Sequence, residues 1–348
     1  MATTAAETLL DSAELRAQIA RFQTVRDAIL AQVHAVIVGQ DEVLEQILIA
    51  LFVGGHCLIT GLPGTAKTLM VRTIAQTLGL VFKRIQFTPD LMPSDITGTD
   101  IIEEDPSTGG RRWTFVPGPI FGNILLADEI NRTPPKTQSA LLEAMQEHTC
   151  TVRGSQHALP APFLVLATQN PIELEGTYPL PEAQLDRFLF NAVLDYLSAE
   201  DELKVVDQTT TSRVVQTETV TGPAEILQFQ SLVRQVPMAA SISAYIVELI
   251  RATRPGSATA PDFVKQYVNF GASVRAAQCI VLGAKVRALA HHRYHVAYED
   301  VLALAAPALR HRLLLNFHAE SERIDADEII RRLLARLPVP AVHKTSTR

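Results

Sequence analysis

The stretch GLPGTAKT (residues 61–68) has the residue types that can hold phosphate groups. It fits the pattern G-x-x-x-x-G-K-[ST], except that Ala66 replaces the second glycine. In such a loop, backbone N–H groups face the phosphates, a lysine reaches the β and γ oxygens, and a hydroxyl holds Mg²⁺. Lys67 and Thr68 are therefore candidate phosphate and magnesium ligands. Glycine before the lysine permits a positive φ, and alanine fits there if that residue is helical.

Two adjacent carboxylates, Asp128 and Glu129, end the apolar run at 124–127. Because the strands of an open α/β sheet bind ligands at their carboxyl ends, Asp128 is expected beside Thr68. Asp128 can then hold Mg²⁺, and Glu129 can polarise an attacking water. Acids at strand ends are also common without a function, so the phosphate loop earlier in the chain favours the catalytic interpretation.

Three further polar residues are candidates for a phosphoryl-transfer site. Asn170 ends the next apolar run, where an uncharged amide can orient water and contact a γ-phosphate, although such residues also form ordinary turns. Arg187 lies in a predicted short helix, and Arg275 lies in the first turn of a helix capped by Ser273. A cation there opposes the helix dipole, which hints at an anionic partner. A salt bridge to a nearby acid is the alternative for both arginines.

The elements that position these residues follow from hydrophobic periodicity. Apolar residues at three- and four-residue steps predict a helix from about residue 8 to 36, and a second helix follows Gly39. Short apolar runs predict buried strands at 56–60, 81–87, 123–127 and 163–167. Strands that alternate with helices predict an α/β fold with a parallel sheet covered on both faces.

Two hairpins and a connector complete the predicted organisation. Residues 98–119, with a DPSTGG tip, read as one hairpin, and residues 149–159, with Gly154 at the centre, read as another. A polar stretch at 209–222 predicts a connector, and only helices are expected beyond it. The predicted domains are a core over 1–208 and a helical domain over 223–340.

Composition limits the class of protein. The 348 residues suffice for two domains, and the net charge of −6 does not favour binding to a phosphate backbone. The three cysteines have no zinc or disulfide spacing, which suits reduced thiols. His291 and His295 share a helix face, but no third ligand lies nearby, so a metal site is not expected there. With no secretory signal and no long apolar run, we expect a cytoplasmic protein without membrane insertion.

These motifs, in this order, resemble the AAA+ ATPases, and specifically the MoxR family, over residues 33–337. The family's loop has the form G-x-P-G-x-A-K-T, which matches residues 61–68 with the alanine included. Other stretches that resemble the family are VGQ, the run from 87 to 98, LADEINR at 126–132, and the run from 175 to 188.

The resemblance implies the site residues and their roles. Lys67 and Thr68 would be Walker A, Asp128 and Glu129 Walker B, Asn170 sensor 1, Arg187 the arginine finger, and Arg275 sensor 2. ATP would be bound by Gly39, Gln40, Gly61, Leu62, Pro63, Gly64, Thr65, Ala66, Lys67, Thr68, Leu69, Asp128 and Arg275, and Mg²⁺ by Thr68 and Asp128. The family usually has proline before the sensor 2 arginine, where this chain has Val274. Because proline there mainly preorganises the backbone, we expect the role of Arg275 to be kept.

The resemblance also implies the architecture and the partners. The fold would be an αβα core followed by an all-helical lid, with 98–119 as the helix-2 insert and 149–159 as the pre-sensor hairpin. The active form would be a homo-hexamer in which Arg187 completes the neighbour's site. The family is associated with chaperone-like work on clients that carry von Willebrand factor A domains, often in assembly or metal insertion. No such domain lies in this chain, so the client would be a separate protein.

The residues support three other functions less well. Related AAA+ rings act on nucleic acid or transcription machinery, and Arg111, Arg112 and Trp113 on the first hairpin could contact DNA, but two arginines in an acidic protein are weak support. A nucleotide-gated scaffold without turnover is disfavoured by Glu129 and Asn170. A GTPase is disfavoured because the sequence contains no N-K-x-D motif.

Overall fold

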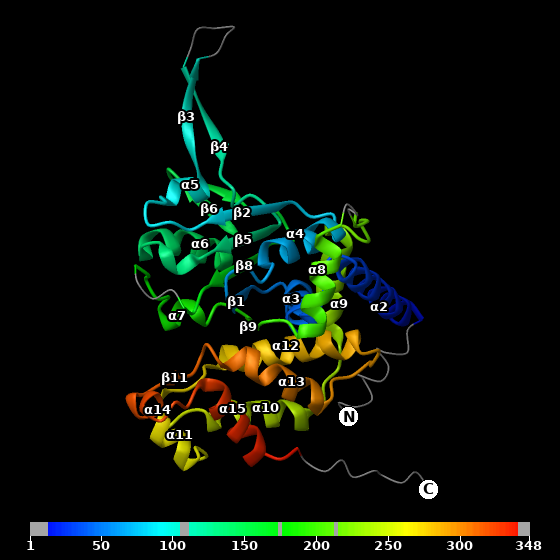
Figure 1. The fold of residues 1–348 in the computed structure, drawn as a ribbon, viewed down its shortest axis with the longest axis vertical. Helices are drawn as coiled ribbons and strands as arrows, with labels where there is room; N and C mark the ends of the chain where they lie inside the picture. The colour runs from blue at the N-terminus through cyan, green and yellow to red at the C-terminus, as the bar shows by residue number, and fades with distance from the viewer. Residues whose placement is uncertain (1–12, 105–110, 173–175, 212–214, 340–348) are drawn as a thin grey trace. The chain divides into compact units, whose positions relative to one another are not determined.

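The computed structural model describes residues 13–104, 111–172, 176–211 and 215–339 (Figure 1). The chain forms two compact units, Met1–Arg234 and Gln235–Arg348, called unit 1 and unit 2 below. The predicted DPSTGG tip of the first hairpin, at 105–110, lies outside the described residues.

A five-stranded parallel sheet forms the centre of unit 1, and its strand order is β2-β5-β8-β1-β9. Its strands are β1 (Cys57–Gly61), β2 (Phe82–Gln86), β5 (Ile124–Asp128), β8 (Leu164–Gln169) and β9 (Phe190–Leu194). The parallel sheet is confirmed, and four strands fall where apolar runs predicted them. Strand β9 was not predicted, although it lies in the apolar run FLFNAVL.

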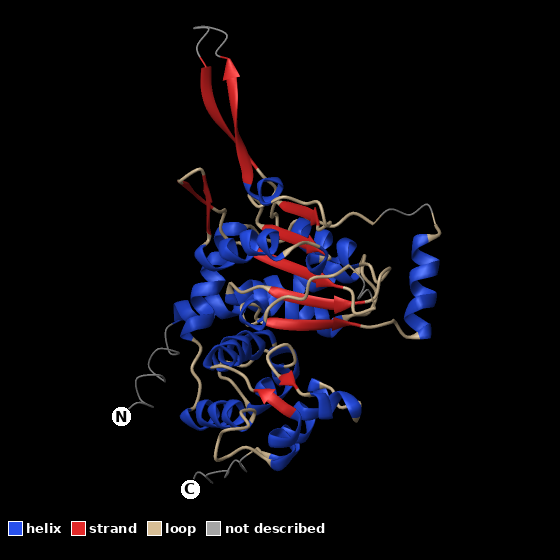
Figure 2. Ribbon diagram, turned by 90° about the vertical axis from the view of Figure 1, so that its left-hand side faces the viewer, coloured by secondary structure: helices blue, strands red, loops and turns tan. Residues whose placement is uncertain are grey.

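Helices cover both faces of this sheet (Figure 2). Helices α3 (Asp41–Val53) and α4 (Lys67–Thr77) pack on one face, and α2 (Ala13–His34) packs against α4. Helices α5 (Pro93–Thr97) and α6 (Pro135–Glu147) lie on the other face. These helices thus form the outer layers of an αβα sandwich.

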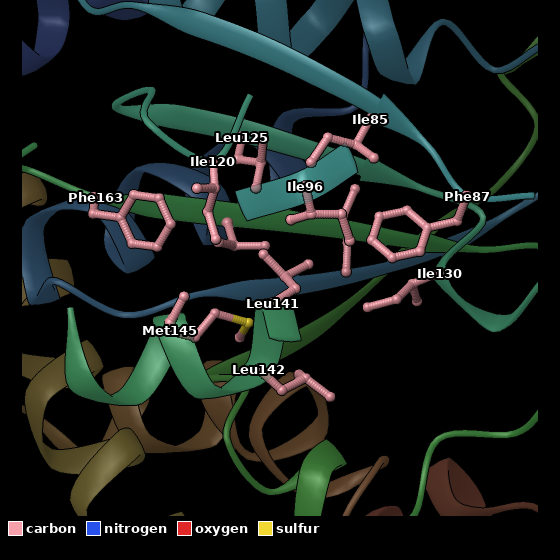
Figure 3. Close-up of a cluster of buried hydrophobic side chains, with 14 of the residues drawn as sticks. Ile85, Phe87, Ile96, Ile120, Leu125, Ile130, Leu141, Leu142, Met145 and Phe163 are labelled. Carbon is pink, nitrogen blue, oxygen red and sulfur yellow. The ribbon is translucent and has the colours of Figure 1, made fainter. Parts of the chain in front are cut away.

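The hydrophobic core under α5 and α6 shows which face of the sheet each side chain of the strands occupies (Figure 3). Leu125 of β5 and Val165 of β8 face this cluster with Leu141 of α6. Since successive side chains of a strand alternate between faces, Asp128 of β5 and Thr168 of β8 point to the opposite face, where α4 lies. The burial pattern therefore aims the last polar residues of both strands toward the phosphate loop.

Both predicted hairpins are present. One pairs β3 (Gly98–Glu104) with β4 (Arg111–Pro117) and projects from the sheet in Figure 2, and the other pairs β6 (Thr149–Val152) with β7 (Ser155–Ala158). Two aromatic contacts join the hairpins. The Arg153 guanidinium lies 4.4 Å from the centre of the Trp113 ring. The rings of Phe115 and His157 stack with their centres 4.0 Å apart.

Unit 1 ends with α8 (Ala199–Thr209) and α9 (Pro223–Gln235). The sequence placed the start of the second domain at residue 223, but α9 packs on unit 1. Its Phe229 ring lies edge-on to Phe22 of α2 and Phe52 of α3, with ring centres 5.3 and 6.0 Å away. Aromatic burial thus ties α9 to the first unit.

Unit 2 is largely helical. Its helices are α10 (Ala240–Ala252), α11 (Asp262–Tyr267), α12 (Val274–Ala290), α13 (Tyr298–Leu309), α14 (Phe317–Ser321) and α15 (Ala326–Arg336). The expectation of an all-helical domain is corrected by a short antiparallel ladder of β10 (Val268–Phe270) and β11 (Leu314–Leu315). Strands this short carry no readable alternation in the sequence. Across the described residues, no helix has the length and apolar character needed to cross a membrane.

Candidate functional site

The phosphate loop connects the end of β1 to the start of α4. Gly61 must lack a side chain, because a Cβ there would lie 2.7 Å from both Cβ and the carbonyl oxygen of Leu194 on β9. Gly64 has a φ of +81°, and, apart from its own chain neighbours, no atom of the described residues lies within 4 Å of the place a Cβ would take. The loop therefore passes close to β9 at its start and is open at its centre.

Ala66 adopts the left-handed conformation, with a φ of 59°. This is the conformation for which the usual pattern supplies glycine. Ala66 therefore has a left-handed backbone and not the right-handed helical backbone in which alanine was expected to fit. An L-residue in this region costs roughly 1–2 kcal/mol. The loop thus keeps the backbone path of a glycine-containing loop.

The Lys67 ammonium group is held inside the loop. Its Nζ donates to the carbonyl oxygens of Gly61 at 2.7 Å and Leu62 at 2.6 Å. Burial lowers the pKa of Lys67, and the nearby Asp128 and Glu129 carboxylates partly oppose that shift. The structure thus brings the predicted phosphate lysine and the predicted carboxylate pair together.

Thr168 fixes the position of both carboxylate residues. Its side-chain oxygen donates to Asp128 Oδ1 at 2.6 Å and accepts from the Glu129 backbone N–H at 2.9 Å. Thr168 is 1% exposed, so water does not replace these bonds. Sequence reasoning missed this residue. Its available signal was a polar residue directly after an apolar strand and two positions before Asn170.

Two side chains of β2 also reach the carboxylates, and neither was singled out from the sequence. Gln86 Nε2 donates to Glu129 Oε2 at 2.8 Å. Arg84 forms an ion pair with Asp128, at 2.6 Å between Nη2 and Oδ2. The same oxygen of Glu129 also faces Arg132, whose Nε lies 3.2 Å from Oε2. Each carboxylate therefore has a cationic partner within unit 1.

Asn170 and Arg187 make contacts within their own unit. Asn170 follows β8 at the same edge of the sheet, and its Oδ1 accepts from the Ile172 N–H at 3.2 Å. Arg187 follows α7 (Glu182–Leu185), and its Nη1 donates to the Leu142 carbonyl oxygen on α6 at 2.7 Å. In the single chain, the predicted arginine finger is thus docked on α6.

Gly39 and Gln40, two of the residues expected to bind ATP, lie beside the end of β9. Gly39 and Gln40 both have positive φ, at 66° and 61°. Gln40 Nε2 donates to the Asp195 carbonyl oxygen at 2.9 Å. Since β9 pairs with β1, this contact places Gly39 and Gln40 at the edge of the sheet that carries the loop.

Arg275 belongs to unit 2. The Ser273 side chain caps α12 by accepting from the Arg275 N–H at 3.1 Å, so the predicted cap is confirmed. The Arg275 side chain is exposed within its unit. Its role as sensor 2 stays a prediction.

The residues present fit a nucleotide with Mg²⁺. The Thr68 hydroxyl and the Asp128 carboxylate would supply the oxygen ligands that Mg²⁺ prefers. The loop centre at Gly64 is uncrowded, and α4 begins at Lys67, so its first N–H groups are available to phosphate oxygens. The remaining predicted contact residues, Pro63, Thr65 and Leu69, lie in or directly after the loop.

Comparison with known proteins agrees with this geometry. The profile of the "ATPase family associated with various cellular activities (AAA)" matches residues 56–190, and the profile of the AAA lid domain matches residues 262–333. A structure from Cytophaga hutchinsonii, described as a candidate ATPase, superposes with a TM-score of 0.85 at 40% identity, over 94% of this chain and 99% of that one. The fold and the matches define an AAA ATPase core followed by a helical lid.

The relatives identify the family within this class. The chain is 41% identical to Chaperone MoxR1 of Mycobacterium tuberculosis, over 93% of this chain and 84% of that protein. It is 29% identical to Protein MoxR of Methylorubrum extorquens, over 89% of this chain and 93% of that protein. It is also 44% identical to the uncharacterized protein YeaC of Bacillus subtilis, over 88% and 92% of the two chains. The chain belongs to the MoxR family of AAA+ ATPases.

Proposed function

We propose that this protein hydrolyses ATP with Mg²⁺ and uses the energy to remodel a protein client. The observation that carries the proposal is the carboxylate pair at the end of β5, which the buried Thr168 holds in place beside β1 and its phosphate loop. Lys67 would exchange the carbonyl oxygens of its own loop for phosphate oxygens. Mg²⁺, held by Thr68 and Asp128, would neutralise phosphate charge during transfer.

Glu129 is the proposed general base. Its Oε2 now accepts from Gln86, and the same oxygen would accept a hydrogen bond from the attacking water and polarise it. Asn170 would orient that water, and Arg275 of the lid would stabilise phosphate charge.

The proposed active form is a ring, a homo-hexamer in the family's manner. Arg187 would then leave the Leu142 carbonyl oxygen and complete the site of the neighbouring subunit. The name of Chaperone MoxR1 supports a protein client over nucleic acid. We propose a client with a von Willebrand factor A domain, met in the cytoplasm, whose assembly or metal loading the protein assists.

The test compares the wild type with Glu129→Gln. The variant should bind Mg-ATP but lose turnover by roughly a hundredfold or more, because general-base catalysis typically contributes 10²–10⁴-fold. It should also retain client proteins in pull-downs from the source cells. Glu147→Gln, an exposed residue at the end of α6, removes the same charge and should change neither result. Equal hydrolysis by wild type and Glu129→Gln would refute the proposal, and capture of DNA alone would favour the nucleic-acid alternative.

A further inference from the structure

Both oxygens of the Asp128 carboxylate are already engaged in this structure. Oδ1 accepts from Thr168 at 2.6 Å. Oδ2 accepts twice from the Arg84 guanidinium, from Nη2 at 2.6 Å and from Nε at 3.2 Å. The proposed magnesium ligand is thus held by a cation that belongs to the same chain.

The register of the sheet explains why Arg84 reaches this carboxylate. Strand β2 pairs in parallel with β5, so that Arg84 lies beside Leu126 and Gln86 beside Asp128. Ile85 faces the core under α6, so Arg84 and Gln86 project from the opposite face, the face of Asp128. The Arg84 side chain runs one pleat along the sheet to meet the carboxylate.

The position of Arg84 allows its guanidinium to move away from the Asp128 carboxylate as well as to bind it. Strand β2 lies at one edge of the sheet, and the Arg84 side chain is 45% exposed, whereas that of Asp128 is 13% exposed. The carboxylate is therefore fixed, and the guanidinium can turn into solvent. Arg84 Nη2 also donates to Gln86 Oε1 at 2.6 Å, which links the contact to the residue that holds Glu129.

We propose that Arg84 is a stand-in cation for Mg²⁺ at Asp128. In the nucleotide-free protein, the guanidinium neutralises the carboxylate and relieves the repulsion between Asp128 and the adjacent Glu129. Mg²⁺ that arrives with the nucleotide takes this place, so metal binding is an exchange of one cation for another. This inference rests on the proposed function, because it assumes that Asp128 serves a nucleotide-bound metal.

The exchange of Arg84 for Mg²⁺ predicts how the Mg²⁺ concentration needed for nucleotide binding changes when Arg84 is removed. A partly exposed ion pair opposes the incoming metal by the free energy needed to break it, so removing Arg84 should lower the Mg²⁺ requirement. For a pair of this exposure, the expected effect is about a 1.5-fold to fivefold lower half-saturating Mg²⁺ concentration. An arginine that only contacted phosphate would behave differently, because its loss would weaken nucleotide binding with or without metal.

The experiment uses the full chain with a fluorescent ADP, N-methylanthraniloyl-ADP. Binding is titrated at rising Mg²⁺ and, separately, in EDTA, for wild type, Arg84→Met and Lys83→Met. Lys83 is the matched control, since it is the neighbouring exposed cation on β2 and its stem lies against Gly122. Arg84→Gln repeats the test with a polar side chain, and thermal unfolding in EDTA checks that each variant is folded.

The proposal expects a lower Mg²⁺ requirement for Arg84→Met and Arg84→Gln and no change for Lys83→Met. In EDTA, the Arg84 variants should bind no more tightly than the wild type, because Asp128 has lost its neutralising cation and no metal replaces it. An unchanged or higher Mg²⁺ requirement in folded Arg84 variants would overturn this inference alone. An equal loss of affinity with and without Mg²⁺ would make Arg84 a phosphate ligand and also overturn it. A wild type that binds no nucleotide at any Mg²⁺ concentration would overturn the proposed function together with it.

Discussion

Replacing Thr168 by valine keeps the branched shape of the side chain and removes only its hydroxyl. That hydroxyl donates to the Asp128 carboxylate and accepts from the Glu129 N–H in a site that is 1% exposed. A hydrogen bond to a charged group contributes about 1.5–3 kcal/mol, and one between neutral groups about 0.5–1.5 kcal/mol. We therefore expect Thr168→Val to lower the free energy of unfolding of unit 1 by about 2–4 kcal/mol.

Two measurements check this value. Thermal unfolding without nucleotide, followed by circular dichroism, should show a transition that is roughly 5–15 °C lower for a unit of this size. Hydrogen exchange should be faster at the Glu129 amide, because its acceptor has been removed. Magnesium-dependent nucleotide binding should weaken as well, since Asp128 loses the bond that orients it.

Thr168→Ser is the control that separates the hydroxyl from the packing. Serine keeps the donor and acceptor and loses one methyl group, which costs about 1 kcal/mol. The reasoning is refuted if Thr168→Val is as stable as the wild type, or if serine is as damaging as valine. In either case the two bonds would not be what holds the carboxylates in place.

The remaining predictions concern the loop, the subunit contact and pH. Ala66→Gly should change the free energy of unfolding by no more than about 1 kcal/mol, because the relief of left-handed strain is offset by the flexibility of glycine in the unfolded chain. Nucleotide binding should persist in this variant. Lys67→Ala should weaken nucleotide binding about tenfold or more in equilibrium titrations. Arg187→Ala should bind ATP without turnover, and mixing it with Lys67→Ala subunits should restore activity; no recovery in stable mixed rings would argue against action on a neighbour. Burial lowers the pKa of His56 to about 4. The neutral His56 ring contributes fully to the free energy of unfolding above pH 6.5, and this contribution, roughly 3 kcal/mol, is lost as the pH falls toward 4. In urea unfolding across this range, the free energy of unfolding should therefore depend less on pH for His56→Gln than for the wild type.

The sequence predicted much of the fold because its strongest signals are local. Buried parallel strands give apolar runs, and four of the five strands in the sheet were found in this way. Strand β9 was missed because only four residues separate it from the short helix at 182–185, and its apolar run begins within that short connection. The β10–β11 ladder was missed because its strands are too short to show alternation.

The sequence predicted the motif residues of the site but not the contacts between strands that hold them in place. Lys67, Asp128 and Glu129 belong to motifs in continuous sequence, so their types and spacing were sufficient. Thr168 and Arg84 act through the register between strands that are far apart in the chain, and a one-residue change in register would turn either away. The backbone of Ala66 was also beyond sequence reasoning, because alanine gives no sign of a positive φ.

The contact between the two hairpins gives the protein an optical signal of its own. Trp113 is the only tryptophan in the sequence, and it lies on β4 with the Arg153 guanidinium over its ring. The Trp113 side chain is also 56% exposed, so its emission should depend on both water and the neighbouring cation. Any event that separates β6–β7 from β3–β4 therefore changes the intrinsic fluorescence, and the movement of these hairpins can be timed in the unlabelled protein.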